Sequence, residues 1–421
     1  MKSAQEVIDW IYACKPDKNA RCLNNLVEIL EKFAKPHNSL KTVHIAGTNG
    51  KGSTVAYLRE AFCQAGYKVA TFTSPYIICF GERLSINNIP ITDADLIKYA
   101  NILKNAIDLS TGKYAPFDLI TLISFLYFKD ANVDIAIYET GIGGRLDATN
   151  VITPLATAIT NVGHDHAEIL GETQLERAME KLGIVKAGVP LFTTEEAADL
   201  LAEFTKVCQA KGADLCLALA NAKLIFANAQ GTQFSCCGYE KITINMYGKH
   251  QFKNATLAVN VLEYLRQHCG FTKLNPLQIT KTAWQGRFEH LQKTPPVVLD
   301  GAHNLEGVQA LIATLGAVYP HHQKRFVFSA IKTKDAQAML ELLGGVAKSI
   351  AFTKGINRKA IAPQILAELY DGQLKTVYAN YQQAITKELS LLEADEVLVI
   401  CGSLYFIADA RKYLLHKWGD K

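Results

Sequence analysis

The sequence predicts an α/β protein with two domains, each built on a mainly parallel sheet. The chain has 421 residues, which exceeds the size at which a single hydrophobic core keeps growing. Short apolar strands alternate with amphipathic helices, and this alternation is typical of parallel sheets. A pair of prolines, Pro295 and Pro296, then marks the expected boundary, because proline stiffens a linker and cannot continue a helix. We therefore expect domains at residues 1–294 and 295–421.

The first domain should contain four parallel strands in its opening half. Each candidate is a run of apolar residues that ends at a polar turn. We expect these strands at residues 42–46, 69–73, 133–138 and 155–160, with helices at 53–65 and 117–129.

The pattern changes between residues 222 and 248, where short alternating segments predict antiparallel strands appended to the first domain. A long helix is expected at residues 254–267. Beyond the two prolines, apolar strands separated by helical stretches return. We expect these strands at residues 296–300, 325–331, 349–353 and 396–400.

Composition excludes several classes of protein. The chain carries 44 basic and 40 acidic residues, a net charge of +4, so charge gives no argument for nucleic acid or a membrane as partner. The longest apolar run, "LITLISFLYF", is too short to span a bilayer, and the N-terminus lacks a signal-peptide layout. Ten scattered cysteines without a CxxC pair indicate reduced thiols rather than zinc or disulfides. We expect a cytoplasmic protein and a monomer.

One glycine-rich turn, "GTNGKGS" at residues 47–53, follows the first predicted strand. Its spacing departs from the strict phosphate-loop pattern, because Gly47 is close to Gly50 and Gly52 separates Lys51 from Ser53. The chemistry of that pattern is nevertheless present. Glycines let amide groups converge on an anion, a lysine neutralises it, and a hydroxyl can reach Mg²⁺. The turn is therefore a candidate phosphate site.

Polar residues also follow the other three strands. In an open parallel sheet, ligands bind outside the carboxyl ends of the strands. Ser74 follows the second strand, Glu139 ends the third before "TGIGGRLDATN", and "NVGHDH" follows the fourth. A carboxylate beside a phosphate loop is where an NTPase positions Mg²⁺, so Glu139 is a candidate ligand. A solvated acid at the end of a strand is the alternative.

For two further residues, His166 and Lys181, a purely structural role is the alternative to a functional one. Because Mg²⁺ prefers oxygen, chemistry alone favours a packed or outer-sphere role for His166, which lies two residues after His164. Lys181 follows Glu180 on a predicted helix, and an exposed ion pair is the simpler interpretation.

Taken together, several segments resemble the folylpolyglutamate synthase and dihydrofolate synthase enzymes of the Mur ligase superfamily. The matching segments occur in the family's order and span residues 46–405. They are "AGTNGKGST", "SPY" with "ERL", "ETGIGGRLDATN", "DHAEILG", "EKLGIVKAG", "GKHQFKNA", "GRFE", "DGAHN" and "CGSLY". The resemblance implies a P-loop-type ATPase domain followed by a smaller Rossmann-like domain, and a ligase that forms an amide bond to L-glutamate through an acyl phosphate.

The resemblance also implies roles for individual residues. Lys51, Lys181 and His166 would be catalytic, and Lys181 matches a lysine that reacts with CO₂ to give a carbamate. Metal ligands, for what we expect to be two Mg²⁺ ions, would be Ser53, Ser74, Glu139 and His166. ATP contacts would be Thr48, Asn49, Gly50, Lys51, Gly52, Ser53, Asn254, Arg287, Asp300 and His303.

The acceptor would be dihydropteroate or a reduced folate. Residues implied on the folate side are Tyr76, Arg83, Phe117, Asp118, Leu146 and Asp147. The family more often has histidine at the position of Tyr76 and glutamate at that of Asp118, so the sequence leaves the preferred folate open. ATP, L-glutamate and the folate are the expected partners.

Two rival functions stay open at this point. A Mur-type ligase that joins an amino acid to a UDP-sugar would share the ATP chemistry. A nucleotide switch or transport ATPase would hydrolyse ATP without glutamate. A dinucleotide-dependent dehydrogenase is less favoured, because the C-terminal half contains no full GxGxxG turn.

Overall fold

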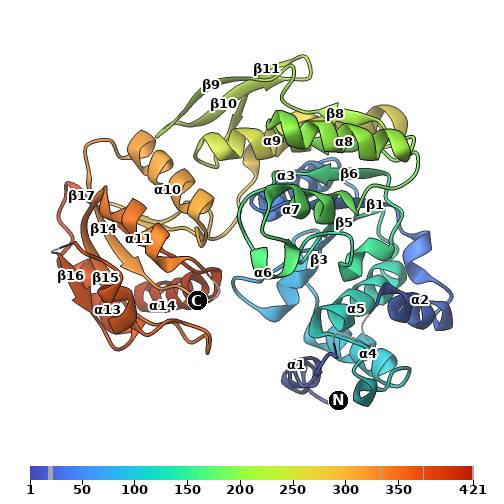
Figure 1. Ribbon diagram of the computed structural model, residues 1–421, viewed down its shortest axis with the longest axis horizontal. Helices are drawn as coiled ribbons and strands as arrows, with labels where there is room; N and C mark the ends of the chain where they lie inside the picture. Colours follow the sequence, from blue (N-terminus) through green and yellow to red (C-terminus); the bar gives the residue numbers. More distant parts are fainter. Residues whose placement is uncertain (18–21, 333, 373, 420–421) are drawn as a thin grey trace. The chain divides into compact units, whose positions relative to one another are not determined.

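The computed structural model describes residues 1–17, 22–332, 334–372 and 374–419. Contacts between Cα atoms divide the chain into two compact units. The first unit comprises residues 1–223, 236–239 and 253–279, and the second comprises residues 224–235, 240–252 and 280–421. Figure 1 shows the elements of both units along the chain.

The first unit contains a mainly parallel sheet. In the described part of the chain its strands run in the order β4-β3-β2-β5-β1-β6-β7-β8. They are β1 (Thr42–Ala46), β2 (Val69–Phe72), β3 (Leu84–Ile86), β4 (Ile89–Pro90), β5 (Ile135–Glu139), β6 (Ala156–Ile159), β7 (Leu191–Thr193) and β8 (Leu215–Leu217). Strands β3 and β4 pair antiparallel, whereas β2, β5, β1, β6, β7 and β8 are parallel.

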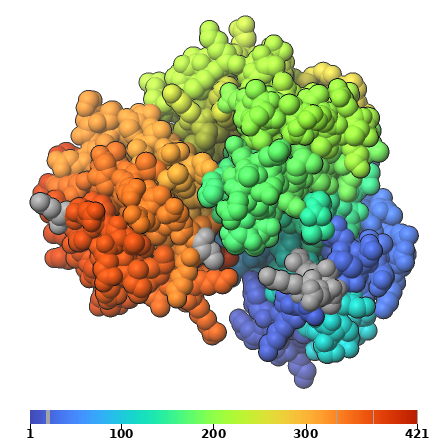
Figure 2. Space-filling view, viewed as in Figure 1, coloured from blue at the N-terminus to red at the C-terminus, as the bar shows by residue number. Residues whose placement is uncertain are grey.

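Helices cover this sheet and form its cores. One buried cluster joins α1, α2, α4 and α5 to Phe72 of β2 and Tyr138 of β5, and a second joins α7 and α8 to Ala46 and Ile159. The surface of α7 and α8, coloured green, is on the near face in Figure 2. The helices are α1 (Ala4–Tyr12), α2 (Leu23–Lys32), α3 (Lys51–Gln64), α4 (Asp93–Lys104), α5 (Pro116–Asp130), α6 (Ala167–Leu170), α7 (Gln174–Leu182), α8 (Ala198–Ala210) and α9 (Lys249–His268).

The register of the parallel strands aligns their carboxyl ends. Ile45 of β1 pairs with Glu139 of β5, and Ala46 pairs with Ile159 of β6. Phe72 of β2 pairs with Tyr138 of β5. The segments that follow β1, β2, β5 and β6 therefore emerge at one edge of the sheet, where ligands of open α/β sheets bind.

The second unit contains a six-stranded sheet in the order β12-β13-β17-β14-β15-β16, counted over the described residues, and β9, β10 and β11 form a separate three-stranded sheet. The strands are β9 (Lys223–Asn228), β10 (Gly231–Cys236), β11 (Tyr239–Ile244), β12 (Glu289–Lys293), β13 (Pro296–Leu299), β14 (Gln323–Phe328), β15 (Ala347–Phe352), β16 (Lys375–Val377) and β17 (Glu396–Cys401). The helices are α10 (Leu305–Val318), α11 (Ala336–Gly344), α12 (Pro363–Glu368), α13 (Tyr381–Ser390) and α14 (Leu404–Trp418).

The predicted α/β class with two parallel sheets is confirmed. The proline pair, however, belongs to a hairpin rather than to an extended linker, because Lys293 of β12 pairs with Pro296 of β13. Most of β9, β10 and β11 is grouped by contacts with the second unit rather than the first. The predicted boundary between residues 294 and 295 stays a prediction.

Within the described ranges, no helix combines the length and the apolar character that crossing a membrane requires.

Candidate active site

The loop after β1 can only be built with glycine at two positions. Gly47 has φ +148°, and a Cβ there would lie 1.8 Å from Thr160 Oγ1. Gly50 has φ +86°, and a Cβ there would lie 2.2 Å from Asn254 Oδ1. Because L side chains rarely adopt these conformations, both residues must be glycine for the loop to keep its path. The same close approach brings Asn254 of α9 to the loop, as the sequence resemblance implies.

Hydrogen bonds hold the loop against the segment that follows β6. The amide of Thr48 donates to the Asn161 carbonyl at 3.0 Å, and the amide of Asn49 donates to Asn161 Oδ1 at 3.0 Å. The Thr160 hydroxyl donates to the Asn49 carbonyl at 2.6 Å. The Lys51 ammonium spans the same loop. Its Nζ donates to the carbonyls of Gly47 at 2.9 Å and of Thr48 at 3.2 Å.

Helix α3 begins immediately after this loop, at Lys51. Its N-cap is Gly50, which has no side chain to accept from the first amide groups of the helix. The amides of the first turn, which include those of Gly52 and Ser53, and the positive end of the helix dipole suit an anion. Ser53 itself is buried in this turn. The loop and helix therefore have the geometry of a phosphate cradle.

A buried carboxylate lies at the same edge of the sheet. Glu139 is the last residue of β5 and only 4% exposed. Its Oε2 accepts a hydrogen bond from the amide of Ser74, which follows β2, at 3.1 Å. The structure thus brings together Ser74 and Glu139, two of the four residues predicted to bind metal.

His166 lies on the segment after β6, at the start of α6. It adopts a left-handed conformation, with φ +54°, and its amide donates to Asp165 Oδ1 at 2.8 Å. The imidazole Nε2 lies 3.8 Å from Asp165 Oδ1, and Nδ1 lies 3.8 Å from Glu168 Oε1. Carboxylate oxygens therefore lie on both sides of the His166 ring.

Lys181 of α7 is buried, not exposed. Only 2% of the residue is accessible, and burial, reinforced by the nearby Lys51 cation, lowers the pKa of its ammonium to about 7. Glu180 pairs instead with Arg145, whose Nη2 lies 2.7 Å from Glu180 Oε1. The interpretation of Lys181 as half of an exposed ion pair is therefore wrong. The electrostatic influence of Lys51 also places the two predicted catalytic lysines near each other.

The donor set at this edge suits a magnesium ion that is shared with phosphate. Among the residues that the structure describes, no three His, Cys, Asp or Glu side chains form a group that could hold a metal by themselves. Mg²⁺ is usually bound through one or two carboxylates together with phosphates and water. Glu139, fixed by the Ser74 amide beside a phosphate cradle, fits that mode of binding.

Two residues predicted on the folate side, Tyr76 and Arg83, form an aromatic and cationic cluster with Phe80. The Arg83 guanidinium carbon lies 5.3 Å from the Tyr76 ring centre and 5.8 Å from that of Phe80, and Arg83 is 7% exposed. Phe117 packs separately on Phe72, with ring centres 5.4 Å apart. The structure therefore brings Tyr76 and Arg83 together.

The remaining three residues differ in exposure. Asp118 is buried in the first turn of α5, where its Oδ2 accepts the amide of Ala115 at 2.7 Å. Leu146 is 58% exposed. Asp147 is buried, and its Oδ2 accepts the amides of Gly141 at 2.8 Å and of Ile142 at 3.1 Å. Burial raises the pKa of the Asp147 carboxyl, and these hydrogen bonds oppose the rise.

A buried hydrogen-bond chain connects this loop to β1. The Thr149 hydroxyl donates to Asp147 Oδ1 at 2.6 Å and lies 2.7 Å from His44 Nε2. Because the only hydroxyl proton goes to Asp147, His44 must donate through Nε2–H. Burial lowers the pKa of His44 to about 3, so this ring is neutral. The chain His44–Thr149–Asp147 therefore fixes the loop of residues 141–147 to the strand that leads into the phosphate cradle.

Replacing Thr149 with valine should lower the stability of the fold by about 2–4 kcal/mol, since it leaves a buried imidazole N–H and a buried carboxylate each without one partner. Thr149→Ser should cost less than about 1 kcal/mol. Urea unfolding followed by circular dichroism measures both. The matched control is Thr205→Val, which removes a hydroxyl bond to Leu201 on the exposed side of α8. Equal effects of the valine and serine variants would contradict the chain.

Three predicted ATP contacts lie close together in the second unit: Asp300 and His303 follow β13, and Arg287 precedes β12. The carboxylate of Asp300 accepts the amides of Phe288 and Ala302, each at 2.8 Å. His303 Nδ1 lies 2.7 Å from the Gly301 carbonyl. A Cβ at Gly301 would lie 2.2 Å from Arg287 Nη1, so Arg287 crosses directly over this turn. Burial raises the pKa of Asp300, and the Arg287 cation opposes the rise.

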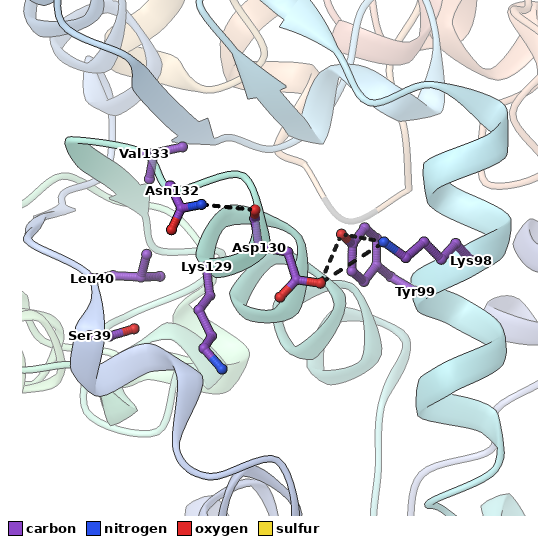
Figure 3. A pocket seen from close by; sticks show the side chains of 8 residues that line it. All are labelled: Ser39, Leu40, Lys98, Tyr99, Lys129, Asp130, Asn132 and Val133. Atoms are coloured by element: carbon purple, nitrogen blue, oxygen red, sulfur yellow. Dashed lines mark hydrogen bonds and ion pairs between the residues drawn. The ribbon is translucent and has the colours of Figure 1, made fainter.

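A surface pocket of about 680 Å³ lies at the opposite edge of the first sheet (Figure 3). Leu40 precedes β1 and Val133 precedes β5, so the pocket is at the amino ends of these strands. Its polar groups interact with one another. The Tyr99 hydroxyl lies 3.1 Å from Lys98 Nζ and 3.2 Å from Asp130 Oδ2. We therefore assign this pocket no part in the site.

Sequence reasoning missed four residues that shape the site. They are the loop supports Thr160 and Asn161 and the buried pair His44 and Thr149. The position of Asn161, two residues after the end of β6, was an available signal. His44 is one buried polar residue in the otherwise apolar strand "TVHIA" after Thr42, and such a residue needs a partner.

Comparison with known proteins agrees with this architecture. The Mur ligase middle domain model matches residues 45–262, and the Mur ligase glutamate ligase domain model matches residues 286–404. A dihydrofolate synthase/folylpolyglutamate synthase from Bacillus subtilis is 38% identical, over 97% of this chain and 99% of its own length. The folylpolyglutamate synthase from Lacticaseibacillus casei is 29% identical, over 93% of this chain and 94% of its own length.

Solved structures give the same result. The folylpolyglutamate synthase from Thermotoga maritima has a TM-score of 0.85 at 28% identity, covering 98% of this chain and 97% of that one. The Mycobacterium tuberculosis folylpolyglutamate synthase complexed with ADP and AMPPCP has a TM-score of 0.87 at 26% identity, covering 97% and 98%. This chain therefore belongs to the dihydrofolate synthase/folylpolyglutamate synthase family of Mur ligases.

Proposed function

We propose that this protein is an ATP-dependent ligase that joins L-glutamate to the carboxylate of dihydropteroate or of a reduced folate. The observation that carries the proposal is the phosphate cradle of Gly47–Lys51, which lies at the same sheet edge as the buried Glu139 carboxylate. Family membership indicates which substrates to expect, because the relatives are named as dihydrofolate and folylpolyglutamate synthases.

The reaction must first activate a carboxylate, which is a poor acyl donor because oxide is a poor leaving group. A carboxylate oxygen of the acceptor attacks the γ-phosphorus of ATP, the bond from that phosphorus to the β–γ bridging oxygen breaks, and ADP leaves. The product is an acyl phosphate. The amine of glutamate then attacks the acyl carbon, a tetrahedral intermediate forms, and phosphate departs as the amine loses its proton. One amide bond is formed for each ATP converted to ADP and phosphate.

The loop residues of the first unit would hold the nucleotide. Phosphoryl transfer depends on positioning and charge neutralisation more than on covalent chemistry by the protein. Lys51, whose ammonium already spans the loop, would neutralise phosphate oxygens, and the amides of residues 48–53 would cradle them. Asn254 would support the loop at Gly50. In the second unit, Arg287, Asp300 and His303 would contact the rest of the nucleotide.

A magnesium ion at this site would be held by Glu139 with Ser53, Ser74 and His166. The buried Glu139 carboxylate and its bond to the Ser74 amide support this assignment. When bound, Mg²⁺ supplies positive charge that stabilises the charge developing on the transferred phosphoryl group.

Lys181 would carry a carbamate. The neutral amine attacks CO₂, a carbon–nitrogen bond forms, and one proton leaves, so a cation becomes an anion that can support a second metal ion. The burial that lowers the pKa of Lys181 to about 7 supports this role, because an ammonium has no lone pair for the attack. Lys51 and Arg177 nearby favour the neutral amine, and they would then favour the carbamate anion.

The acceptor would lie against the loops after β2 and β5. Tyr76 offers a half-buried aromatic ring with the buried Arg83 guanidinium against it, which suits contact with a pterin ring. Leu146 is exposed and lies next to Asp147, which two backbone amides hold in place. This exposure suits an apolar contact with the acceptor. Phe117 and Asp118 lie in the first turn of α5, and a Cβ at Gly141, in the loop after β5, would lie 2.8 Å from the Phe117 ring, so this turn borders that loop.

Measuring ADP release with Mg-ATP while each other component is omitted in turn tests the proposal. We expect release with L-glutamate and either dihydropteroate or tetrahydrofolate, and at least tenfold less when glutamate or the acceptor is left out. Product mass should increase by one glutamyl residue. Release that does not depend on glutamate would instead support a nucleotide switch, and release with a UDP-sugar would support the other ligase class.

A further inference from the structure

Arg177 of α7 places a positive charge near Lys181, but the hydrogen bonds of its buried guanidinium go elsewhere. The residue is 4% exposed, although its side chain is charged. Its Nε donates to the Gly163 carbonyl at 3.0 Å, and its Nη1 donates to the carbonyls of Gly171 at 3.0 Å and of Glu172 at 2.8 Å. Three of its hydrogen bonds therefore go to backbone oxygens, which indicates a role in holding a chain segment in place.

These carbonyls lie at the two ends of one segment, residues 163–172. Gly163 begins it, and Gly171 and Glu172 end it. The segment carries Asp165 and His166, and one planar guanidinium ties both of its ends to α7. Lysine could not replace this arrangement, because its single ammonium does not present donors in a rigid fork.

The beginning of the segment is also tied to the phosphate cradle. The amide of Gly163 donates to Thr48 Oγ1 at 2.9 Å. Arg177 and Thr48 thus hold the same residue from two sides, one through its carbonyl and the other through its amide. Any shift of Gly163 would move His166 relative to the cradle.

Helix α7 does not need Arg177 to begin. Thr173 and Glu176 form a capping box, in which the Thr173 amide donates to Glu176 Oε2 at 2.9 Å and the Glu176 amide donates to Thr173 Oγ1 at 3.2 Å. Loss of the Arg177 bonds should therefore release the segment of residues 163–172 while the helix itself persists.

We propose that Arg177 is a positioning residue that pins both ends of the segment of residues 163–172 and thereby fixes His166 and Asp165 beside the phosphate cradle for metal and nucleotide binding. The inference rests on the proposed function of that edge of the sheet. Arg177 acts through the segment and does not itself touch the substrate.

The test compares Arg177→Lys with wild type and with the control Arg145→Lys. Arg145 lies in the loop after β5 and pairs at the surface with Glu180 of the same helix, so its change keeps the charge and leaves the segment pinned. Two quantities are measured: Mn²⁺ affinity by electron paramagnetic resonance with the non-hydrolysable nucleotide AMPPCP, and the Mg²⁺ dependence of ADP release. Thermal unfolding is followed in parallel.

We expect Arg177→Lys to weaken Mn²⁺ binding and to raise the half-saturating Mg²⁺ concentration, each by about tenfold or more. Its kcat at saturating Mg²⁺ should fall by a smaller factor, and the control should match wild type. Unchanged metal affinity in folded Arg177→Lys would overturn the inference. Arg177→Gln is the second variant, and if neither variant folds, Arg177 serves folding and the inference also fails. A wild-type protein without glutamate-dependent ADP release would instead refute the proposed function.

Discussion

Replacing Lys51 with methionine should lower glutamate-dependent ADP release by about 10²–10³-fold or more, while the fold loses at most about 2 kcal/mol of stability. The methionine keeps the length and apolar part of the side chain but removes the cation that would neutralise the phosphates, and charge stabilisation of this kind is worth factors of that size. The lost bonds to the Gly47 and Thr48 carbonyls should cost only about 1 kcal/mol each. Steady-state kinetics and thermal unfolding measure the two effects.

Lys68→Met is the matched control for this variant. The Lys68 ammonium also donates to a backbone carbonyl, that of Ala131, but it lies before β2, at the opposite edge of the sheet from the cradle. We expect wild-type kinetics from it. Wild-type turnover of Lys51→Met at saturating ATP would show that the loop after β1 does not bind the phosphates.

Replacing Lys181 with methionine should abolish most of the activity and yet stabilise the fold near neutral pH. Activity falls because methionine cannot form a carbamate. Stability rises because a buried ammonium is costly, and burial has lowered the pKa of Lys181 from 10.5 to about 7. That difference corresponds to about 5 kcal/mol at most, at 1.36 kcal/mol for each unit. Arg145→Met, an exposed change on the same unit, is the control.

The stability difference has a defined dependence on pH. Between pH 7 and 10.5 the unfolded chain binds the Lys181 proton and the folded chain does not, so the wild type gains stability as pH rises. The advantage of Lys181→Met should therefore be greatest below about pH 7 and should vanish near pH 10.5. Unfolding of both proteins in CO₂-free buffers measures it. Full activity in the variant would refute the carbamate, and a pH-independent difference would refute the buried cation.

The fold was largely predictable because its strongest signals are local. The strand expected at residues 42–46 matches β1, and the helix expected at 53–65 matches α3 within two residues at its start. The strands that escaped prediction are short or antiparallel, such as β3, β4 and β16. A strand of about three residues is too short to show the alternation of apolar and polar residues clearly. Its pairing in the sheet also depends on strands that are distant in the sequence.

The candidate site was predictable where it follows strands. The loop of residues 47–53, Ser74 and Glu139 each come directly after or at the end of an apolar run, and the parallel register then places them at one edge. Contacts across long separations could not be predicted. The chain from His44 to Thr149 depends on tertiary packing, which a single sequence does not display, and only the family resemblance grouped Asn254 with the loop that it approaches at Gly50.

Lys181 shows how burial can reverse a local interpretation. Its neighbour Glu180 made an exposed ion pair the simplest expectation, since adjacent opposite charges on a helix are usually solvated. On α7, however, Lys181 faces the interior and Glu180 faces Arg145. Lys181 is buried because it lies on the side of α7 that packs against the sheet. The surrounding fold, and not the neighbouring residue, sets which side of the helix that is.

The fate of the oxygen atoms in the acceptor carboxylate shows whether the reaction passes through an acyl phosphate. Dihydropteroate or tetrahydrofolate labelled with ¹⁸O in the reacting carboxylate is turned over with unlabelled Mg-ATP and L-glutamate, and the released phosphate is analysed by mass spectrometry. Activation through an acyl phosphate predicts one ¹⁸O atom in each phosphate formed. Phosphate without ¹⁸O, with amide bond formation intact, would show that the carboxylate does not attack the γ-phosphorus and would rule out the acyl phosphate.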